Sequence, residues 1–386
     1  MESPSEHQQF DFTRLGPLVM GSAGFSYQLN ADPESLPLER ILLRAFDLGL
    51  RTIDTSPYYE PSEQLFGAAL SSPTISSEYK RGDYILMTKA GRIKEKEFNY
   101  SPDWIRKSVA RSLQRFNTTY LDVVFCHDVE FVSIEEAVTA VATLVDIKER
   151  TGAIKAVGIS GYRIDVLVEV ARLARERFGR PVVEIVQNWA QLTLQNTRLE
   201  QVGFQALRET GVRAVVCSSP LAVGLLRYGG IPVGRTGDWH PAPQGLRAAA
   251  QKAAQWVHGR QDGHSMSQIA MRFAVSLAAK NSRPGFMVTT ASGISSLRDL
   301  EENVATTRSI LHSATGKNNA NQEEPLVRLT EVDEVELARD KEYYDGIRAI
   351  LGGWVDFDFA DSAPKNAEIH EKEAGNLKRE TINARI

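Results

Sequence analysis

Four side chains that can hold or transfer a proton follow closely behind apolar stretches of the sequence. Asp54 and Tyr59 lie in the segment DTSPYYE, Lys89 lies in MTKAG, and His127 lies in CHD. The preceding stretches RTI, DYILM and LDVVF have the apolar and β-branched residues of buried strands. Because the active sites of α/β folds form at the carboxyl ends of their strands, we expect these four side chains to share one site.

A carboxylate, a phenol, an amine and an imidazole in one site can move a proton in step with a hydride. A buried lysine beside a tyrosine favours the phenolate, so Lys89 is expected to lower the pKa of Tyr59. Asp54 would keep the amine charged and fixed, and His127 would hydrogen-bond and orient a substrate oxygen. The pattern predicts a proton relay centred on Tyr59.

The elements that must position these residues are short β-branched runs separated by longer segments of helical period. Several runs are almost continuously apolar, which is typical of parallel strands covered on both faces. Ser101 with Pro102, and Ser133 with Glu136, are capping patterns that predict helix starts between the runs. The predicted strands comprise residues 18–22, 51–55, 84–89, 121–127, 154–160, 182–188, 213–219 and 286–292.

Two folds use this alternation of strands and helices. A doubly wound dinucleotide-binding fold would carry a G-x-G-x-x-G motif after its first strand. None of the 28 glycines lies two positions from another, so that motif is absent. The number of strands instead matches a (β/α)8 barrel. We therefore predict an α/β fold, a (β/α)8 TIM barrel with a C-terminal extension.

The composition limits the classes of partner. Apolar residues make up 42% and charged residues 24% of the chain, as in ordinary soluble proteins. A formal net charge of -4 provides no basic field for nucleic acid, and no apolar run approaches the about 20 residues that span a membrane. Cys126 and Cys217 cannot form a disulfide framework, and the start of the chain resembles no signal peptide, so we expect a cytoplasmic protein. The seven histidines are scattered, so no metal site is expected.

Three regions are expected along the chain. Residues 1–14 are predicted to be a polar tail, and residues 15–360 the barrel domain. The polar stretch SATGKNNANQEEP, residues 313–325, is predicted to be a flexible insertion in that domain. Residues 361–386 have little to bury, which predicts disorder or a solvated helix. The sequence indicates no oligomeric state.

The spacing of the four side chains resembles that of the aldo-keto reductase family, in which a D-x-(A/S)-x-x-Y segment is followed by Lys and then His. Here DTSPYY runs from Asp54 to Tyr59, and Lys89 and His127 follow in the expected strand context. The resemblance covers about residues 15–308. It implies a nicotinamide cofactor bound on a barrel, with Tyr59 as the acid/base, Lys89 and Asp54 tuning it, and His127 orienting the substrate.

The resemblance extends to segments that would hold the nicotinamide. Ser160 and Gln187 fall where the family holds the carboxamide of that ring. The family commonly has Ser-Asn where this chain has Ser160-Gly161, so one amide contact is lost. Asn188 is a candidate to replace it.

A second departure follows the seventh predicted strand. The family's Tyr-Ser-Pro-Leu segment is here SSPL, so Ser218 replaces the aromatic platform that stacks on nicotinamide. Ser218, Pro220 and Leu221 are nevertheless expected to contact the cofactor. Trp189 is a poorer substitute for the missing ring than a wall of the substrate pocket or a filler of the barrel.

The segment SGISSLRDLEENV, residues 292–304, resembles the family's last cofactor segment, whose helix start faces pyrophosphate and adenosine. The usual Lys and Arg that grip a 2′-phosphate fall here at Gly293 and Asp299. A carboxylate repels a phosphate but accepts a hydrogen bond from a free ribose hydroxyl, whereas the adjacent Arg298 is able to reach a phosphate. NAD is therefore expected, with NADP as the alternative. The contacts expected in this segment are Gly293, Ser295, Asp299, Glu302 and Asn303.

Together with the segments AGFSYQ and TIDTSPYYEPSEQLFG, these departures resemble the sugar 1-dehydrogenase branch of the family. The branch implies NAD-dependent oxidation of an aldose, D-arabinose first, at C1 to the aldono-1,4-lactone, with Tyr59 as general base. One alternative is an NADPH-dependent reductase of aldehydes or ketones, and another is a nucleotide-binding auxiliary subunit. The candidate walls of the substrate pocket are Phe25, Tyr58, Trp189, Trp239 and Trp354.

Overall fold

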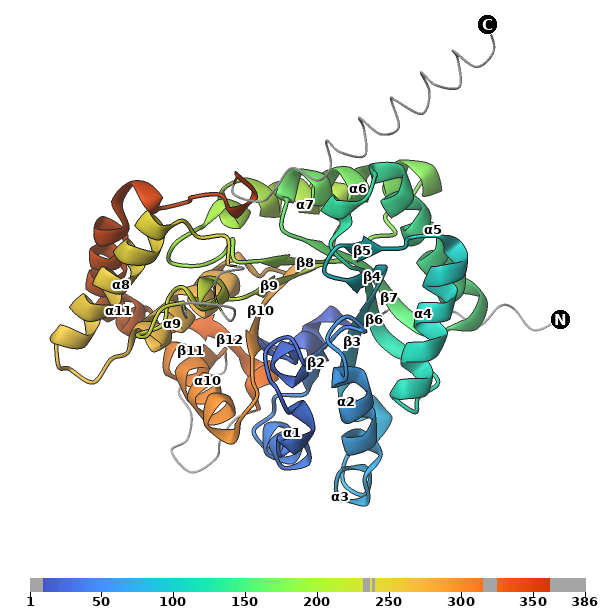
Figure 1. Ribbon diagram of the computed structural model, residues 1–386, viewed down its shortest axis with the longest axis horizontal. Coiled ribbons are helices and arrows are strands. Elements are labelled where there is room, and N and C mark those ends of the chain that lie inside the picture. The colour runs from blue at the N-terminus through green and yellow to red at the C-terminus, as the bar shows by residue number, and fades with distance from the viewer. Residues whose placement is uncertain (1–9, 232–236, 238–239, 315–324, 362–386) are drawn as a thin grey trace, which may run out of the picture.

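The computed structural model describes residues 10–231, 237, 240–314 and 325–361. Its centre is a closed barrel of parallel strands in the order β1-β10-β9-β8-β7-β6-β3-β2 (Figure 1). Each strand overlaps a stretch predicted from the sequence, so the predicted (β/α)8 barrel is confirmed. The barrel strands are β1 (Leu18–Gly21), β2 (Thr52–Asp54), β3 (Ile85–Ala90), β6 (Leu121–Cys126), β7 (Ile154–Gly161), β8 (Ile185–Trp189), β9 (Ala214–Ser218) and β10 (Met287–Gly293).

Helices follow most of the strands and cover the outside of the barrel (Figure 1). The predicted capping residues start two of them, because Ser101 Oγ accepts from the N–H of Trp104 and Ser133 Oγ accepts from that of Glu136. The helices are α1 (Leu38–Asp47), α2 (Ser62–Ser71), α3 (Pro73–Ser76), α4 (Pro102–Arg115), α5 (Ile134–Thr151), α6 (Ile164–Phe178), α7 (Phe204–Thr210), α8 (Gln244–Gly259), α9 (Met266–Asn281), α10 (Leu297–Ile310) and α11 (Glu334–Leu351).

The C-terminal extension begins with α11, which packs beside α8 and α9 (Figure 1). A buried ion pair joins the extension to the barrel helices, because Arg272 Nε donates to Asp340 Oδ2 at 2.6 Å. The predicted insertion at 313–325 and the predicted tail at 361–386 lie almost wholly outside the described residues. Two small antiparallel sheets escaped prediction: β4 (Arg92–Lys94) with β5 (Glu97–Phe98), and β11 (Leu311–Ser313) with β12 (Leu329–Val332).

The interior of the barrel is apolar below the rim where the strands end. Inward-facing residues of the strands form a cluster of their own, which includes Val19, Met87 and Phe125. Phe10 and Phe12 belong to the same cluster and are 6% and 3% exposed. The predicted polar tail is therefore wrong for Phe10 and Phe12, whose rings form an apolar plug against the inward-facing residues of the strands, whereas Asp11, Thr13 and Arg14 are exposed.

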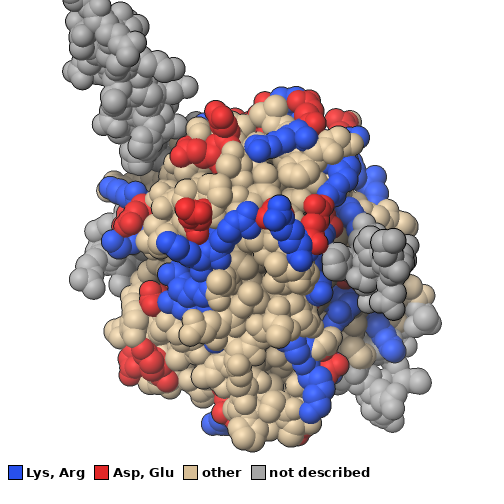
Figure 2. Space-filling view, turned by 90° about the vertical axis from the view of Figure 1, so that its right-hand side faces the viewer, with Lys and Arg blue, Asp and Glu red and all other residues tan. Residues whose placement is uncertain are grey.

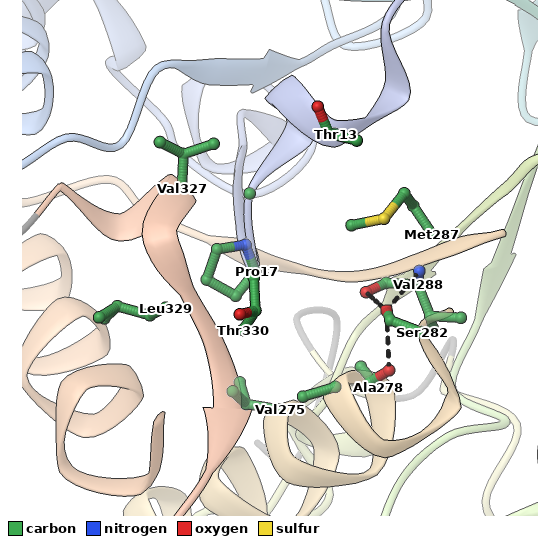
Figure 3. Close-up of a pocket in the computed structure, with 12 residues that line it drawn as sticks. Thr13, Pro17, Val275, Ala278, Ser282, Met287, Val288, Val327, Leu329 and Thr330 are labelled. Carbon is green, nitrogen blue, oxygen red and sulfur yellow. Dashed lines mark hydrogen bonds between the residues drawn. The ribbon is translucent and has the colours of Figure 1, made fainter. Parts of the chain in front are cut away.

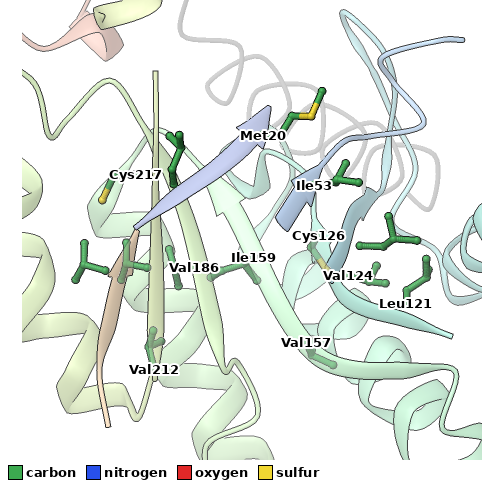
Figure 4. Packing of buried hydrophobic residues seen from close by; sticks show 14 of the residues in the cluster. Met20, Ile53, Leu121, Val124, Cys126, Val157, Ile159, Val186, Val212 and Cys217 are labelled. Carbon is green, nitrogen blue, oxygen red and sulfur yellow. The ribbon is translucent and has the colours of Figure 1, made fainter. Parts of the chain in front are cut away.

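Residues of opposite parity on the same strands face the helices. Figure 4 shows this layer around Ile53, Val124, Val157 and Val186, which belong to the main hydrophobic core. The alternation has period two, as strand geometry requires. It determines which polar side chains at the strand ends can point into the barrel mouth.

A small cavity lies at the amino-terminal end of the barrel (Figure 3). It is lined by Pro17 before β1, by Met287 and Val288 at the start of β10, and by neighbouring residues of α9 and β12. Its volume of about 30 Å³ leaves room for little more than one water molecule. The cavity is therefore too small to hold an organic ligand.

The face at the right of Figure 1 carries both signs of charge. Figure 2 shows basic side chains in a band across the middle of this face and acidic side chains scattered around it. None of the helices in the described ranges is both long and apolar enough to span a lipid bilayer.

Candidate active site

Polar side chains replace apolar ones where the barrel strands reach their carboxyl ends. Lys89 lies two residues after Met87, and Gln187 two residues after Ile185, both of which face the barrel interior. The same spacing of two places the side chain of Ser218 beside them. The strand alternation therefore turns these side chains into the mouth, where the sequence placed one shared site.

Asp54 and Lys89 form a buried ion pair at the centre of this rim. Lys89 Nζ lies 2.8 Å from each carboxylate oxygen of Asp54 and 2.9 Å from the carbonyl oxygen of Thr55. These contacts use all three donors of the ammonium group. The two side chains are only 3% and 7% exposed, so water screens the pair little.

Gln187 extends this pair toward β9. Its Nε2 donates to Asp54 Oδ2 and to Ser218 Oγ, both at 2.8 Å. Its Oε1 is buried and has no hydrogen-bond partner. The amide thus has one acceptor left for a ligand.

Tyr59 and His127 lie on the mouth side of the ion pair. Their ring centroids are 5.9 Å apart at 84°, and Lys89 Nζ is 5.2 Å from the Tyr59 centroid. Burial and the Asp54 carboxylate raise the pKa of Tyr59 above its usual value. The expectation that Lys89 lowers this pKa is wrong here, because the ammonium group is directed at Asp54 and Thr55.

His127 is held as a neutral imidazole. Its Nδ1 lies 3.0 Å from Ser56 Oγ, and its Nε2 lies 3.5 Å from Asp128 Oδ2. Burial lowers the pKa of His127 to about 3, with Lys89 and Arg92 acting in the same direction against Asp128. A neutral ring has one N–H donor and one acceptor, which suits a substrate hydroxyl.

Beside His127 lies an ion pair that the sequence reasoning missed. Arg92 Nη1 is 2.5 Å from Asp128 Oδ2, and the Arg92 guanidinium lies 4.1 Å from the centroid of Tyr58. Asp128 has a left-handed backbone with φ 59°, and its carboxylate lies between Arg92 and His127. Only one signal was available, the acidic residue directly after His127, because β4 is too short to predict.

The two residues predicted to hold the nicotinamide carboxamide beside Gln187 behave differently. Ser160 Oγ accepts from the N–H of Asp128 at 3.3 Å, which joins the ends of β6 and β7. Asn188 Nδ2 donates to the carbonyl oxygens of Gly161 and Tyr162 at 3.1 and 2.8 Å. The donors of Asn188 therefore stabilise the chain after β7, and its Oδ1, which is buried without a partner, is the atom left for a ligand.

The residues after β9 form a tight turn rather than a stacking surface. Ser219, Ala222 and Val223 all have left-handed backbones, with φ of 60°, 47° and 58°. Pro220 and Leu221 lie inside this turn and follow Ser218 at the mouth. The turn lies beside the end of β10, because β9 and β10 are neighbours in the barrel.

The last predicted cofactor segment lies at the end of β10 and the start of α10. Gly293 is level with Gly21 of β1, so no side chain stands at either place. Asn303 Nδ2 donates to Ser292 Oγ at 3.2 Å, which fixes the helix to the strand. The structure thus brings Gly293 and Asn303 to the same rim as Ser218.

The acidic residues of this segment already have partners in the protein. Asp299 Oδ2 accepts from the N–H of Ser295 at 3.2 Å and from its hydroxyl at 3.3 Å. Arg298 Nε lies 2.7 Å from Glu302 Oε1 on the exposed side of α10. Asp299 therefore orders the helix start, and Glu302 partly neutralises the arginine nearest to the predicted adenosine site.

Of the predicted pocket walls, one is wrong and one lies outside the described residues. Phe25 is fully buried and packs edge-on against Phe66 at 5.2 Å, so it belongs to the core. Trp239 is outside the described ranges. Tyr58 lies 5.9 Å from the His127 ring, and Trp189 packs 4.5 Å from Tyr162.

The segment after α11 carries Trp354, the last of the predicted pocket walls, and packs against residues that follow β7 and β8. Phe359 N–H donates to Tyr162 Oη at 2.8 Å, and Gln195 Nε2 donates to the carbonyl oxygen of Trp354 at 3.0 Å. Phe359 also lies 6.5 Å from Trp189. The C-terminal segment therefore packs Phe359 against Tyr162, which follows β7, and against Trp189 of β8.

The rim fits a nicotinamide cofactor. Ser22 Oγ, Gln187 Oε1 and Asn188 Oδ1 are buried polar atoms without hydrogen-bond partners in the protein. All three lie at or just past the carboxyl ends of barrel strands, where a polar ligand would satisfy them. In the described part of the chain, no three side chains of the metal-binding types gather into a site.

Comparison with known proteins agrees with this geometry. Residues 17–312 match the sequence model described as "Aldo/keto reductase family". D-arabinose 1-dehydrogenase of Saccharomyces cerevisiae is 40% identical over 268 residues, which cover 69% of this chain and 77% of the yeast protein. L-galactose dehydrogenase of Arabidopsis thaliana is 32% identical over 263 residues, covering 68% and 75%.

A solved structure shares the fold. It is aldo-keto reductase AKR11C1 from Bacillus halodurans in its holo form, with a TM-score of 0.54 and 20% sequence identity. The match covers 82% of this chain and 92% of the bacterial one. At this identity the likeness supports the barrel architecture alone.

Proposed function

The chain belongs to the aldo/keto reductase family of nicotinamide-dependent oxidoreductases, and on that premise we propose that it oxidises an aldose at C1. D-arabinose is the first candidate substrate, because the yeast relative is a D-arabinose 1-dehydrogenase at 40% identity. The observation that carries the proposal is the buried Asp54–Lys89 pair beside Tyr59 and His127 at one end of the barrel.

In this proposal Tyr59 accepts the proton of the C1 hydroxyl. His127, which is neutral, hydrogen-bonds that hydroxyl and presents it to the phenol. The bound cofactor supplies the acceptor for the hydride that leaves C1. Loss of one hydride and one proton converts the cyclic aldose to the aldono-1,4-lactone.

The ion pair below Tyr59 has a positioning role. Asp54 holds the Lys89 ammonium group, and Gln187 holds Asp54, so the polar floor of the site is fixed before substrate binds. Preorganised charges cost no reorganisation during the reaction. Arg92 and Asp128, next to His127, offer a donor and an acceptor to further sugar hydroxyls.

NAD is the proposed cofactor. Two carboxylates, Asp299 and Glu302, stand in the first turns of α10, where a 2′-phosphate would be repelled. Arg298 is already paired with Glu302. The nicotinamide end would be held by Ser160, Gln187 and Ser218, with Pro220 and Leu221 beside them.

A reductase of aldehydes or ketones is the second candidate. Its support is the raised pKa of Tyr59, which keeps the phenol protonated and ready to donate. The same residues can catalyse oxidation and reduction, so the test must compare these two directions of the reaction. Purified protein is incubated with NAD and D-arabinose, L-galactose or L-fucose, and separately with NADPH and simple aldehydes.

NADH formation from at least one of these sugars is the expected result. Turnover with NADPH and aldehydes alone would replace the proposal by the reductase. In either direction Tyr59→Phe should lower kcat by about 10²-fold or more while NADH still binds. Near-normal kcat in this variant would refute the role of Tyr59, and cofactor binding without any turnover would favour the auxiliary subunit.

A further inference from the structure

Glu130 is a partly buried carboxyl group beside the mouth that the reaction described above does not use. It lies in the short helix Val129–Phe131, three residues after His127. Its Oε1 accepts from the N–H of Tyr162 at 2.7 Å, whereas its Oε2 is buried and has no hydrogen-bond partner. A buried polar atom left without a partner calls for a ligand or a special role.

The carboxyl group of Glu130 occupies the space of a missing side chain. A Cβ atom added to Gly161 would lie closer than 3.0 Å to Glu130 Oε2, a distance that real Cβ atoms do not show. The backbone of Gly161 has no positive φ, so its conformation does not require glycine. In its present position the Glu130 carboxyl group fills the space that a side chain at Gly161 would need, so the two groups would compete for one place.

That place adjoins the residues expected to hold the nicotinamide ring. Gly161 directly follows Ser160, and Ser160 is level with Gln187 on the neighbouring strand. In the resemblance described above, the family carries an asparagine at the position of Gly161 for an amide contact. Asn188 has no donor to offer there, because its amide nitrogen donates to the carbonyl oxygens of Gly161 and Tyr162, and only its Oδ1 is without a partner.

We propose that Glu130 replaces this asparagine and binds the carboxamide group of the nicotinamide cofactor through Oε2. A protonated carboxyl group has one O–H donor and one carbonyl oxygen that accepts, as a side-chain amide has a donor and an acceptor on its two ends. Since Oε1 accepts from Tyr162 N–H, the proton resides on Oε2 and is donated to the carboxamide oxygen. The inference rests on the proposed nicotinamide chemistry but not on the identity of the sugar.

The surroundings of Glu130 favour its protonated form. Burial raises the pKa of Glu130, and the Asp128 carboxylate acts in the same direction. The N–H of Tyr162 and the Arg92 guanidinium oppose them, and Arg163 is the other cation within range. Arg92 is itself paired with Asp128, which limits its effect on Glu130.

The test measures NADH affinity without sugar, by titration of cofactor fluorescence. Glu130→Ala should raise the Kd for NADH by about tenfold or more, because it removes a hydrogen bond in a buried site. Glu130→Gln keeps a donor at the same place and should stay within about threefold of the original. Glu135→Ala, at an exposed residue of α5, is the matched control and should leave the Kd unchanged.

A double variant separates a direct contact from a loss of structure. Glu130→Ala with Gly161→Asn returns an amide to the freed space and should recover most of the lost affinity. The inference is overturned if Glu130→Ala binds NADH as the original protein does, or if the double variant folds but shows no recovery. A rise in KM for sugar at unchanged NADH Kd would also overturn it and leave the proposed function standing. Conversely, weaker NADH binding in a protein that oxidises no sugar would support the inference and remove the sugar proposal.

Discussion

Neutralising both members of the Asp54–Lys89 pair should destabilise the protein much less than the sum of the effects of neutralising each alone. At 2.8 Å the gross attraction between the two charges is about 6 kcal/mol for an effective dielectric constant of about 20. Lys89→Met removes the cation and leaves the Asp54 carboxylate buried with Gln187 Nε2 as its remaining side-chain donor. A single buried charge left in this way costs about 3–5 kcal/mol of the free energy of unfolding.

The double variant Asp54→Asn with Lys89→Met buries no charge. It should cost less than the sum of the two single variants by about 2 kcal/mol or more, because desolvation of both ions disappears together with their attraction. The assay is urea unfolding followed by tryptophan fluorescence, with the free energy of unfolding taken from the midpoint and slope of each curve. The matched control is Lys94→Met, which breaks the exposed ion pair with Glu97 and should cause no measurable loss.

Strict additivity of the two single variants would refute this reasoning. It would mean that Lys89 and Asp54 do not depend on each other, and that the geometry around Tyr59 does not rest on their ion pair. A large effect of Lys94→Met would also contradict it, because the surface pair has the same chemistry without the burial.

Three further predictions concern pH and cofactor. Burial and Asp54 raise the pKa of Tyr59, so the fraction of Tyr59 in its base form grows as pH rises. The value of kcat/KM for sugar oxidation, measured from initial rates, should therefore increase by up to about tenfold per pH unit from neutral to alkaline pH. A flat pH profile would contradict this. The pKa of His127 falls to about 3 from 6.5, so as pH drops below about 6.5 the unfolded state takes up the proton first, and the free energy of unfolding should fall by about 1.4 kcal/mol per pH unit. His127→Gln should remove that slope in urea unfolding at pH 4–6, and an unchanged slope would assign it to other groups. Glu302→Gln frees Arg298 from its ion pair. The Kd for NADPH should then fall by about threefold or more at low salt, while the Kd for NADH stays constant. Equal changes in the two Kd values would show that Arg298 does not reach a 2′-phosphate.

The barrel was predictable because its strands carry their own signal. Runs such as LDVVF are apolar on both faces, and a polar residue two positions beyond an inward apolar one must point into the mouth. This placed Lys89 and His127 together before any coordinates. The plug formed by Phe10 and Phe12 was missed, because two phenylalanines in a polar segment show no period and their burial depends on the open end of the barrel.

The error over the pKa of Tyr59 has a different origin. Sequence spacing places Lys89 near Tyr59, and a nearby cation alone would lower the pKa of a phenol. The structure shows that the ammonium group donates twice to Asp54, so the phenol lies in a buried site where the Asp54 carboxylate also acts on it. Burial then dominates and raises the pKa. Whether the pKa of Tyr59 is raised or lowered depends on where the three N–H donors of the Lys89 ammonium group point. The spacing of residues in the sequence carries no information about those directions.

Gly161 shows that a departure from a family pattern can be misinterpreted from the sequence and then explained by contacts between distant segments in the structure. In the sequence, the missing side chain looks like a lost contact, and the neighbouring strand offers Asn188 as the nearest amide. In the structure, the nitrogen of that amide donates to the backbone after β7, and the space beside Gly161 holds a carboxyl group from the loop after β6. In this proposal, Gly161 at the end of β7 and Glu130 in the short helix after β6 act as one substitution, and a variant that restores the asparagine must also remove the glutamate to regain the space.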